Sequence, residues 1–227
     1  MATSDARSLQ LALARVAEVF AGMTAHPDEV GCGRCYGADE VALLRTADAA
    51  LSAELVDLVA VEAPDHWDDQ PAVIRRVLPQ LAVLLAEGST SPDLAARGLA
   101  AARWSQWPEQ QVQAVLGFLE AWWRWTLRQD SPPTPAREVF ESCATASSSV
   151  GPWLSLWETE EAPAADRHLA ECAAWWWDDL QSNSSPLTWW WGPAEQERAA
   201  CRELRTWLAS NGDHRVRLRH PSSESRW

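Results

Sequence analysis

The sequence contains no lysine, and all 19 of its basic residues other than histidine are arginines. A lysine is essential to the phosphate-binding loop of P-loop NTPases, to protein kinases and to enzymes that form Schiff bases. The sequence therefore excludes these three classes of enzyme. The Gly-x-Ser-x-Gly motif of serine hydrolases and the His-Glu-x-x-His motif of zinc proteases are also missing. We expect a protein without enzymatic activity.

Long hydrophobic runs are absent as well. No run of about 18 apolar residues occurs in the sequence, which predicts that no segment spans a membrane. Asp5, Arg15 and Glu18 interrupt the apolar residues near the N-terminus, which argues against a secretory signal peptide there. Five cysteines, an odd number in a chain of 227 residues, are not typical of a secreted disulfide framework. We therefore expect a cytoplasmic protein.

Strict alternation of apolar and polar residues, the pattern of a half-buried strand, is also missing. Apolar residues recur at helical spacing nearly throughout, and short turn-rich segments separate the helical stretches. The fold class expected is all-α, an irregular antiparallel array of about ten helices, either a bundle or a HEAT-like stack. Pro79 predicts a kink, and Asn211-Gly212 predicts the end of the last helix. The expected helices lie near 4–20, 38–45, 52–61, 71–86, 91–104, 108–128, 134–146, 152–157, 164–180 and 193–210.

Basic residues are fewer than acidic ones, and the net charge is −13. Residues 214–227 hold four arginines and one glutamate, so this segment carries +3 and residues 1–213 carry −16. We therefore expect a single all-α domain over 1–213 and a basic C-terminal tail over 214–227. The acidic domain would repel nucleic acids and anionic membranes. The tail either lies solvated or docked on the domain, or binds a polyanion, and the oligomeric state stays open.

The cysteine pair Cys32-Gly-Arg-Cys35 is the sharpest local motif. Two cysteines separated by two residues in a glycine-rich turn can direct both sulfurs at one tetrahedral metal ion. Zinc domains usually carry a second such pair, which is absent here, and no strand–helix unit typical of thioredoxin precedes the motif. A structural zinc site, a redox dithiol and a turn with free thiols therefore all remain open. The candidate additional ligands are His26, His66, Cys143, Cys172 and Cys201.

Tyrosine occurs once and phenylalanine three times, whereas tryptophan occurs 16 times. Most of these rings would fill the core. Two sets of three are consecutive, and three successive residues sweep about 200° of a helix, which is wider than one core-facing stripe. At least one ring of a helical triplet should therefore be exposed, where it would bind a protein partner, with inert packing or a small ligand as alternatives. The candidate partner-binding residues are Trp175, Trp176, Trp177, Trp189, Trp190 and Trp191.

Three motifs in residues 1–90 carry a resemblance to a group of bacterial proteins. The Cys32-x-x-Cys35 pair, Trp67-Asp68-Asp69 and the Leu78-Pro79 helix together resemble a family of uncharacterised bacterial all-helical proteins. In that family a cysteine pair precedes a helix, and a segment with tryptophan and acidic residues leads into a Leu-Pro helix. The resemblance implies a helical fold and the cysteine pair, and it implies no activity. This chain departs from the family in its excess of tryptophan and in lacking an aromatic residue before Leu78.

The function expected from these features is that of an acidic, tryptophan-rich protein-interaction module without enzymatic activity. An immunity- or antitoxin-like role, in which it binds a basic protein partner, is consistent with its charge. The alternative is a zinc-binding or redox protein centred on Cys32 and Cys35, with His26 and His66 as candidate metal ligands. The first interpretation needs no cofactor, and the second predicts a structural zinc ion.

Overall fold

The computed structural model describes residues 4–182, 184–188 and 190–219, with the backbone alone for residues 4 and 212–219. Within these residues the chain forms α-helices, two short 3-10 helices (η) and no strand, which confirms the all-α prediction. The helices are α1 Ser4–Val19, α2 Ala38–Leu44, α3 Ala53–Val61, η1 Pro64–His66, α4 Gln70–Glu87, α5 Pro92–Ala101, η2 Trp104–Gln106, α6 Glu109–Arg128, α7 Ala136–Ser147, α8 Gly151–Glu158, α9 Pro163–Gln181 and α10 Ala194–Arg219.

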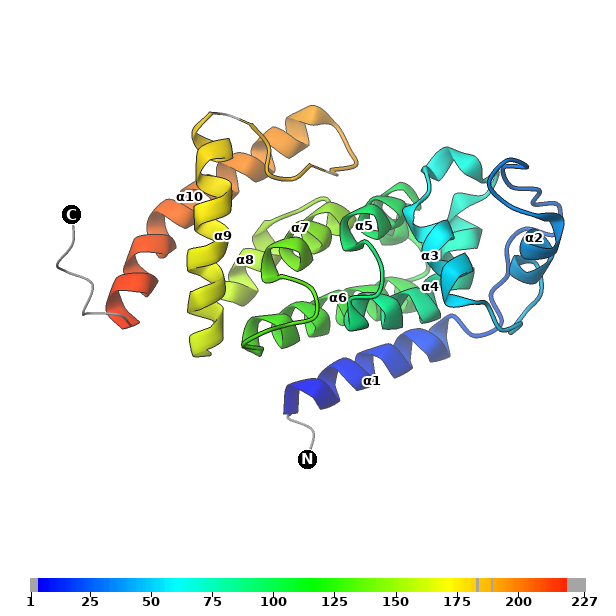
Figure 1. The fold of residues 1–227 in the computed structure, drawn as a ribbon, viewed down its shortest axis with the longest axis horizontal. Coiled ribbons are helices and arrows are strands. Elements are labelled where there is room, and N and C mark those ends of the chain that lie inside the picture. Colours follow the sequence, from blue (N-terminus) through cyan, green and yellow to red (C-terminus); the bar gives the residue numbers. More distant parts are fainter. Residues whose placement is uncertain (1–3, 183, 189, 220–227) are drawn as a thin grey trace.

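The helices stack into an elongated array, with α2 at one end and α9 and α10 at the other (Figure 1). Helix α1 lies along α6 and also contacts α4, whereas α5 packs against α7. Helix α3 bridges α4 and α5, and α9 contacts α6, α7 and α10. In the part of the chain that the structure describes, no helix combines the length and the apolar character needed to cross a membrane.

Local signals at the helix ends explain most of these boundaries. The Ser52 hydroxyl accepts the N–H of Leu55 at 3.1 Å and begins α3. The Asp69 carboxylate accepts the N–H of Ala72 at 3.0 Å and begins α4. Gly88 ends α4 with a φ of 69°, a left-handed conformation that favours glycine. Asp69 and Gly88 therefore set the two ends of α4, which continues through Pro79.

The last helix is longer than its sequence predicts. The prediction that Asn211-Gly212 ends it is wrong, because α10 continues to Arg219. One glycine costs a helix only about 1 kcal/mol relative to alanine, and the arginines and leucine that follow favour the helix again. The predicted boundary between domain and tail at residue 213 therefore falls inside α10. Residues 220–227 of the predicted tail lie outside the described residues.

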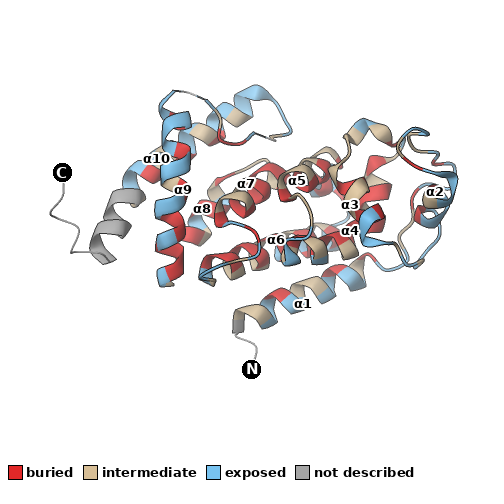
Figure 2. Ribbon diagram, in the orientation of Figure 1, coloured by how far each residue is buried: buried red, intermediate tan, exposed pale blue. Residues whose placement is uncertain are grey.

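Large aromatic rings fill the core from α6 to α9, and Figure 2 shows how the buried residues concentrate along the middle of the array. Trp123 and Trp157 meet edge to face with their ring centroids 5.1 Å apart. Their indole N–H groups donate to the carbonyls of Trp153 and Ala165, each at 3.1 Å, so these rings are buried without losing a hydrogen bond. The tryptophans with exposures of 1% or less are Trp122, Trp123, Trp153, Trp157 and Trp176.

Candidate functional site

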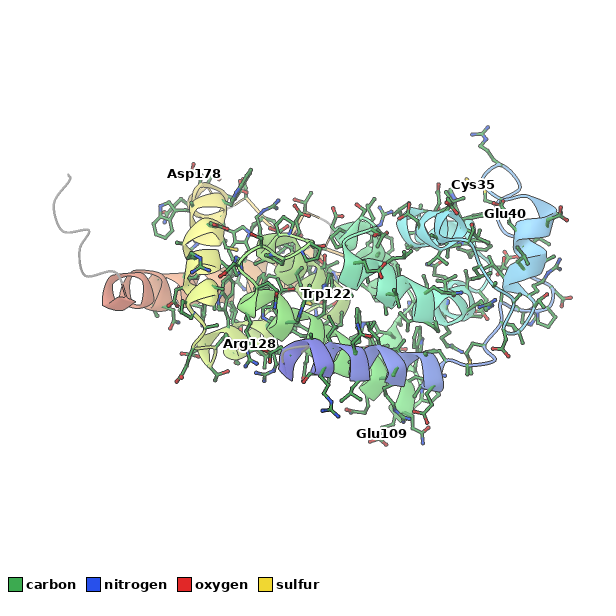
Figure 3. All side chains as sticks on the ribbon, turned by 60° about the horizontal axis from the view of Figure 1, so that its bottom comes forward. Cys35, Glu40, Glu109, Trp122, Arg128 and Asp178 are labelled. Atoms are coloured by element: carbon green, nitrogen blue, oxygen red, sulfur yellow. The ribbon has the colours of Figure 1, made fainter. Side chains whose placement is uncertain are left out.

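Three side chains of the kind that bind metals converge at the α2 end of the array. Cys32 and Cys35 lie in the loop before α2, and His66 is the last residue of η1. One potential ligand atom from each residue lies within 4.8 Å of the other two, and all three residues are partly buried. Figure 3 shows Cys35 beside Glu40, at the opposite end of the molecule from Asp178. The fold thus brings together residues that are 31 positions apart in the chain.

A tight turn holds the two cysteines. The N–H groups of Cys35 and Tyr36 both donate to the carbonyl of Cys32 at 3.0 Å. The N–H groups of Arg34 and Cys35 also donate to the sulfur of Cys32, which lowers the pKa of that thiol. Glu40 accepts the N–H of Gly37 at 2.7 Å, so that α2 begins directly after the turn. The backbone of this turn therefore stabilises a thiolate, the form of cysteine that binds metals.

The two thiols differ in acidity. The hydrogen bond that Cys35 makes to Cys32 raises the pKa of Cys35, and its burial and the charges of Cys32 and Glu62 add to this shift. Cys32 therefore loses its proton first, and Cys35 keeps its own and donates it to the Cys32 thiolate. A bound cation would displace this second proton because metal ligands must be deprotonated. The same asymmetry is also typical of a redox dithiol.

His66 makes the cluster suitable for zinc. Its Nδ1 lies 3.5 Å from the sulfur of Cys35 and 2.9 Å from Oε2 of Glu62. Tetrahedral zinc, with a Zn–S distance of about 2.3 Å and a Zn–N distance of about 2.0 Å, would separate a sulfur and a nitrogen ligand by about 3.5 Å. The separation of Cys35 and His66 therefore fits two ligands of one ion. The Glu62 carboxylate contacts the same ring nitrogen, but it is not one of the three residues whose ligand atoms lie within 4.8 Å of one another.

A buried carboxylate ties the cysteine loop to the start of α4. Glu29 is 1% exposed and accepts the N–H groups of Gly31 at 3.0 Å, Asp68 at 3.2 Å and Asp69 at 2.9 Å. Burial by itself would raise the pKa of Glu29, but these backbone donors, with that of Val30, hold the pKa below its ordinary value. Glu29 therefore stays ionised and fixes the position of the loop.

The ring of Trp67 packs against the same loop. Gly31 has a φ of 61°, and a Cβ at this position would lie 2.7 Å from the Trp67 ring, so any other residue would adopt an unfavourable backbone conformation and displace the ring. The ring of Tyr36 lies against Trp67 with centroids 4.2 Å apart, and burial raises the pKa of Tyr36 above its ordinary value. The Trp67-Asp68-Asp69 motif thus has a structural reason, because its ring and its two N–H groups hold the cysteine turn in place.

The other candidate ligands lie elsewhere. His26 is exposed, and its Nδ1 accepts the N–H of Asp28 at 3.2 Å, so it is not part of the group. Cys143, Cys172 and Cys201 lie in α7, α9 and α10, away from α2 (Figure 1). Burial raises the pKa of each of these three thiols. Among the described residues, the metal-ligand group consists of Cys32, Cys35 and His66.

The triplet on α9 is divided by the geometry of its helix. Trp176 is 1% exposed and donates its N–H to Oε1 of Glu141 at 2.7 Å. Trp175 and Trp177 are 68% and 47% exposed, which confirms that a helical triplet cannot bury all of its rings. The guanidinium of Arg137 lies over the Trp175 ring, 4.9 Å from its centroid. The α9 surface therefore presents two large apolar side chains to solvent.

The second triplet lies in a different environment. Trp190 and Trp191 lie in the connection between α9 and α10, and Trp189 lies outside the described residues. Trp190 is half-buried against the core. Trp191 is 46% exposed and borders a cleft of about 730 Å³ that also reaches Arg103 and Trp104. The helical argument thus applies to the first triplet alone.

Comparison with known protein families, with curated proteins and with solved structures finds no match to this chain. Its function is therefore argued from the chemistry of the residues that the fold brings together. The two cysteines and His66 form the group in the described structure whose donor atoms have the most specific chemistry.

Proposed function

We propose that this protein binds one zinc ion through Cys32, Cys35 and His66, and that the ion joins the cysteine loop to the α3–α4 junction. The observation that carries this proposal is the convergence of three ligand atoms, within 4.8 Å of one another, from two separate segments. Two thiolates and an imidazole are a donor set that zinc prefers. Glu62, whose carboxylate lies beside the His66 nitrogen that faces Cys35, would supply the fourth ligand after its side chain turns toward the two sulfurs.

The role proposed for this ion is structural. A structural zinc ion has four protein ligands, whereas a catalytic one keeps a position open for water or substrate. With Glu62 as the fourth ligand no position would stay open, and contacts of Glu29 and Trp67 hold the loop in place. The proposal also places the protein in a reducing compartment such as the cytoplasm, because Cys32 and Cys35 bind metal only as reduced thiolates.

Metal analysis of the purified, reduced chain tests the proposal. We expect about one zinc ion per wild-type chain and less than about a tenth of that in Cys32→Ser or His66→Ala, since each change removes one of the few ligands of a site. Cys201→Ser is the matched control, because Cys201 is a half-buried cysteine hydrogen-bonded to Ser185 and lies outside the cluster. Wild-type protein that neither contains zinc nor takes it up after reduction would contradict the proposal. A reversible Cys32–Cys35 disulfide in that metal-free protein would support the redox alternative.

The exposed tryptophans of α9 favour a second function, that of an interaction module without enzymatic activity. We propose that Trp175 and Trp177 bind a basic protein partner, in an immunity- or antitoxin-like role. Glu171, Asp178 and Asp179 are exposed and lie one helical turn from Trp175. Indole rings bind arginine and lysine through cation–π contacts, and the surrounding carboxylates would attract such residues.

Calorimetric titration with a nona-arginine peptide at low salt tests this second proposal. We expect Trp175→Ser combined with Trp177→Ser to weaken binding of the peptide at least about tenfold. A tenfold change corresponds to about 1.4 kcal/mol, the size of a modest contribution from one interface residue. Leu11→Ser is the matched control, because Leu11 is a 63% exposed apolar residue on the distant helix α1. Equal affinities of the double variant and the control would contradict the proposal.

A further inference from the structure

A cavity of about 550 Å³ lies where the end of α1 and the connection before α3 meet α4. None of the residues that line it belongs to the proposed zinc centre. Its volume is in the range of sites that bind small molecules. The wall is mostly apolar, and its larger apolar side chains include Phe20, Met23, Leu51, Val56, Val83 and Leu84.

One cation lines this apolar cavity. Arg76, on α4, is 6% exposed, and its Nη2 donates to the carbonyl of Ala49. Its Nε is buried and has no hydrogen-bond partner. None of the ion pairs formed between described residues includes Arg76. The guanidinium is therefore buried beside a cavity with an unused donor and without a salt bridge.

The nearby carboxylate compensates this charge only in part. Burial lowers the pKa of Arg76, and the charge of Asp48 offsets this shift without cancelling it. Asp48 is exposed at the edge of the cavity, and its Oδ1 accepts the N–H of Gly22 at 3.0 Å. Its φ of 55° is a left-handed conformation, which aspartate adopts in turns more readily than most residues other than glycine. A partly compensating carboxylate and a buried cation thus border the same cavity.

A buried charge without a partner destabilises a protein, and arginine cannot avoid this cost by losing its proton. An anionic group bound in the cavity would supply the missing partner. A carboxylate matches the planar guanidinium, with which it can form two parallel hydrogen bonds. The apolar wall would at the same time bury the hydrocarbon part of such a ligand.

We propose that this cavity binds a carboxylate with an apolar body, of the kind of a medium-chain fatty acid. The carboxylate pairs with the guanidinium of Arg76, and the hydrocarbon chain packs against the apolar wall. Arg76 is the residue that selects an anionic ligand, since no other arginine lines the cavity among the described residues. This site is independent of the zinc centre and of the α9 surface.

Calorimetric titration of the full chain with decanoate and with decanol tests the proposal. The two probes have the same chain length and differ in the head group, so their comparison isolates the carboxylate. We expect saturable, one-site binding of decanoate and at least tenfold weaker binding of decanol. Arg76→Met keeps a long side chain and removes the charge, and we expect it to weaken decanoate at least tenfold. Arg15→Met is the matched control, because Arg15 is exposed on α1 and pairs with Glu18.

A further variant keeps the test valid if Arg76→Met does not fold. Ala53 is exposed at the wall of the cavity, so Ala53→Trp is expected to fill part of the cavity, to preserve the fold and to weaken decanoate at least tenfold. Three results would each overturn the proposal: no saturable binding of decanoate, equal affinities for decanoate and decanol, or an affinity for decanoate that neither Arg76→Met nor Ala53→Trp changes.

Discussion

The two ends of the helical array are stabilised by different kinds of interaction. At the α2 end, the cysteine loop is held by backbone hydrogen bonds to Glu29 and by the ring of Trp67. At the other end, α6 to α10 are joined by rings such as Trp123, Trp157 and Trp176, which pack directly on one another. A loop with few large apolar residues relies on buried polar contacts and, in our proposal, on a metal ion. The comparison predicts that metal chelation and low pH destabilise the α2 end. Substitutions that leave a cavity among the buried rings should destabilise the aromatic end.

The largest loss of stability is expected from a substitution that leaves a cavity in the aromatic core. Trp157 is fully buried and contacts the rings of Trp123, Phe140, Trp176 and Trp207. Trp157→Ala should lower the free energy of unfolding by about 3–5 kcal/mol, measured by urea denaturation. Trp175→Ala, at the 68% exposed position of α9, is the control and should change it by less than about 1 kcal/mol. Equal losses in the two variants would contradict the described packing.

Removal of zinc should affect the opposite end. At free zinc about a hundredfold above the dissociation constant, chelation is expected to remove about 2.7 kcal/mol of stability. Hydrogen exchange followed by mass spectrometry should show faster exchange in residues 29–45 after chelation and unchanged exchange in α6. Faster exchange of α6 alone, or no change in residues 29–45, would argue against a metal ion that stabilises the loop.

Protonation of Glu29 should weaken the same loop. The folded-state pKa of Glu29 is lowered, so this carboxylate stabilises the folded protein above its unfolded pKa of about 4.3, and its contribution is lost as the pH falls through the lower folded-state value. Glu29→Gln should cost about 1–3 kcal/mol at pH 7, and the difference from wild type should shrink below about pH 4. The measurement is urea denaturation across this pH range, with Asp28→Asn as the control, because the Asp28 side chain is 94% exposed. A difference that stays constant with pH would contradict this role.

The smallest effect is expected at a single glycine. Gly31→Ala should lower the free energy of unfolding by about 1–2 kcal/mol because alanine disfavours a positive φ. Contact of the new Cβ with the Trp67 ring would lower it further. Gly33→Ala is the matched control within the same turn, since a Cβ there meets nothing within 4 Å. Thermal denaturation of both variants checks the prediction, and equal stabilities would show that the Trp67 ring does not limit Gly31.

Much of the fold follows from local sequence signals. The spacing of apolar residues predicts α4 over 71–86, and the observed Gln70–Glu87 differs by one residue at each end because Asp69 and Gly88 are strong boundary residues. The exposure of Trp175 and Trp177 follows from helix geometry in the same way. The end of α10 was not predictable from Asn211-Gly212, because one glycine weakens a helix without ending it.

The candidate sites depend more on tertiary packing. The spacing of Cys32 and Cys35 predicts that they act together, but only the fold places His66 beside Cys35 and leaves His26 exposed. The contact of Glu62 with His66 was not predictable from their spacing of four residues, because Glu62 lies after the end of α3 and His66 lies in η1, so the two residues do not share a helix.

Two residues that sequence reasoning missed are buried charges. Nothing in the sequence indicates that Glu29 is buried, because the partners that join it to α4 are the backbone N–H groups of Asp68 and Asp69, from a distant segment. The position of Arg76, three residues after the buried Val73, was a signal that this cation shares the buried face of α4.

X-ray absorption at the zinc edge, on wild-type protein and on Cys32→Ser, tests the proposed centre most directly. The account predicts about two sulfur ligands at about 2.3 Å and about two nitrogen or oxygen ligands at about 2.0 Å in the wild type. Cys32→Ser should lose this signal together with the metal. A wild-type spectrum with oxygen and nitrogen ligands alone, or a sulfur contribution that persists unchanged in Cys32→Ser, would contradict the account.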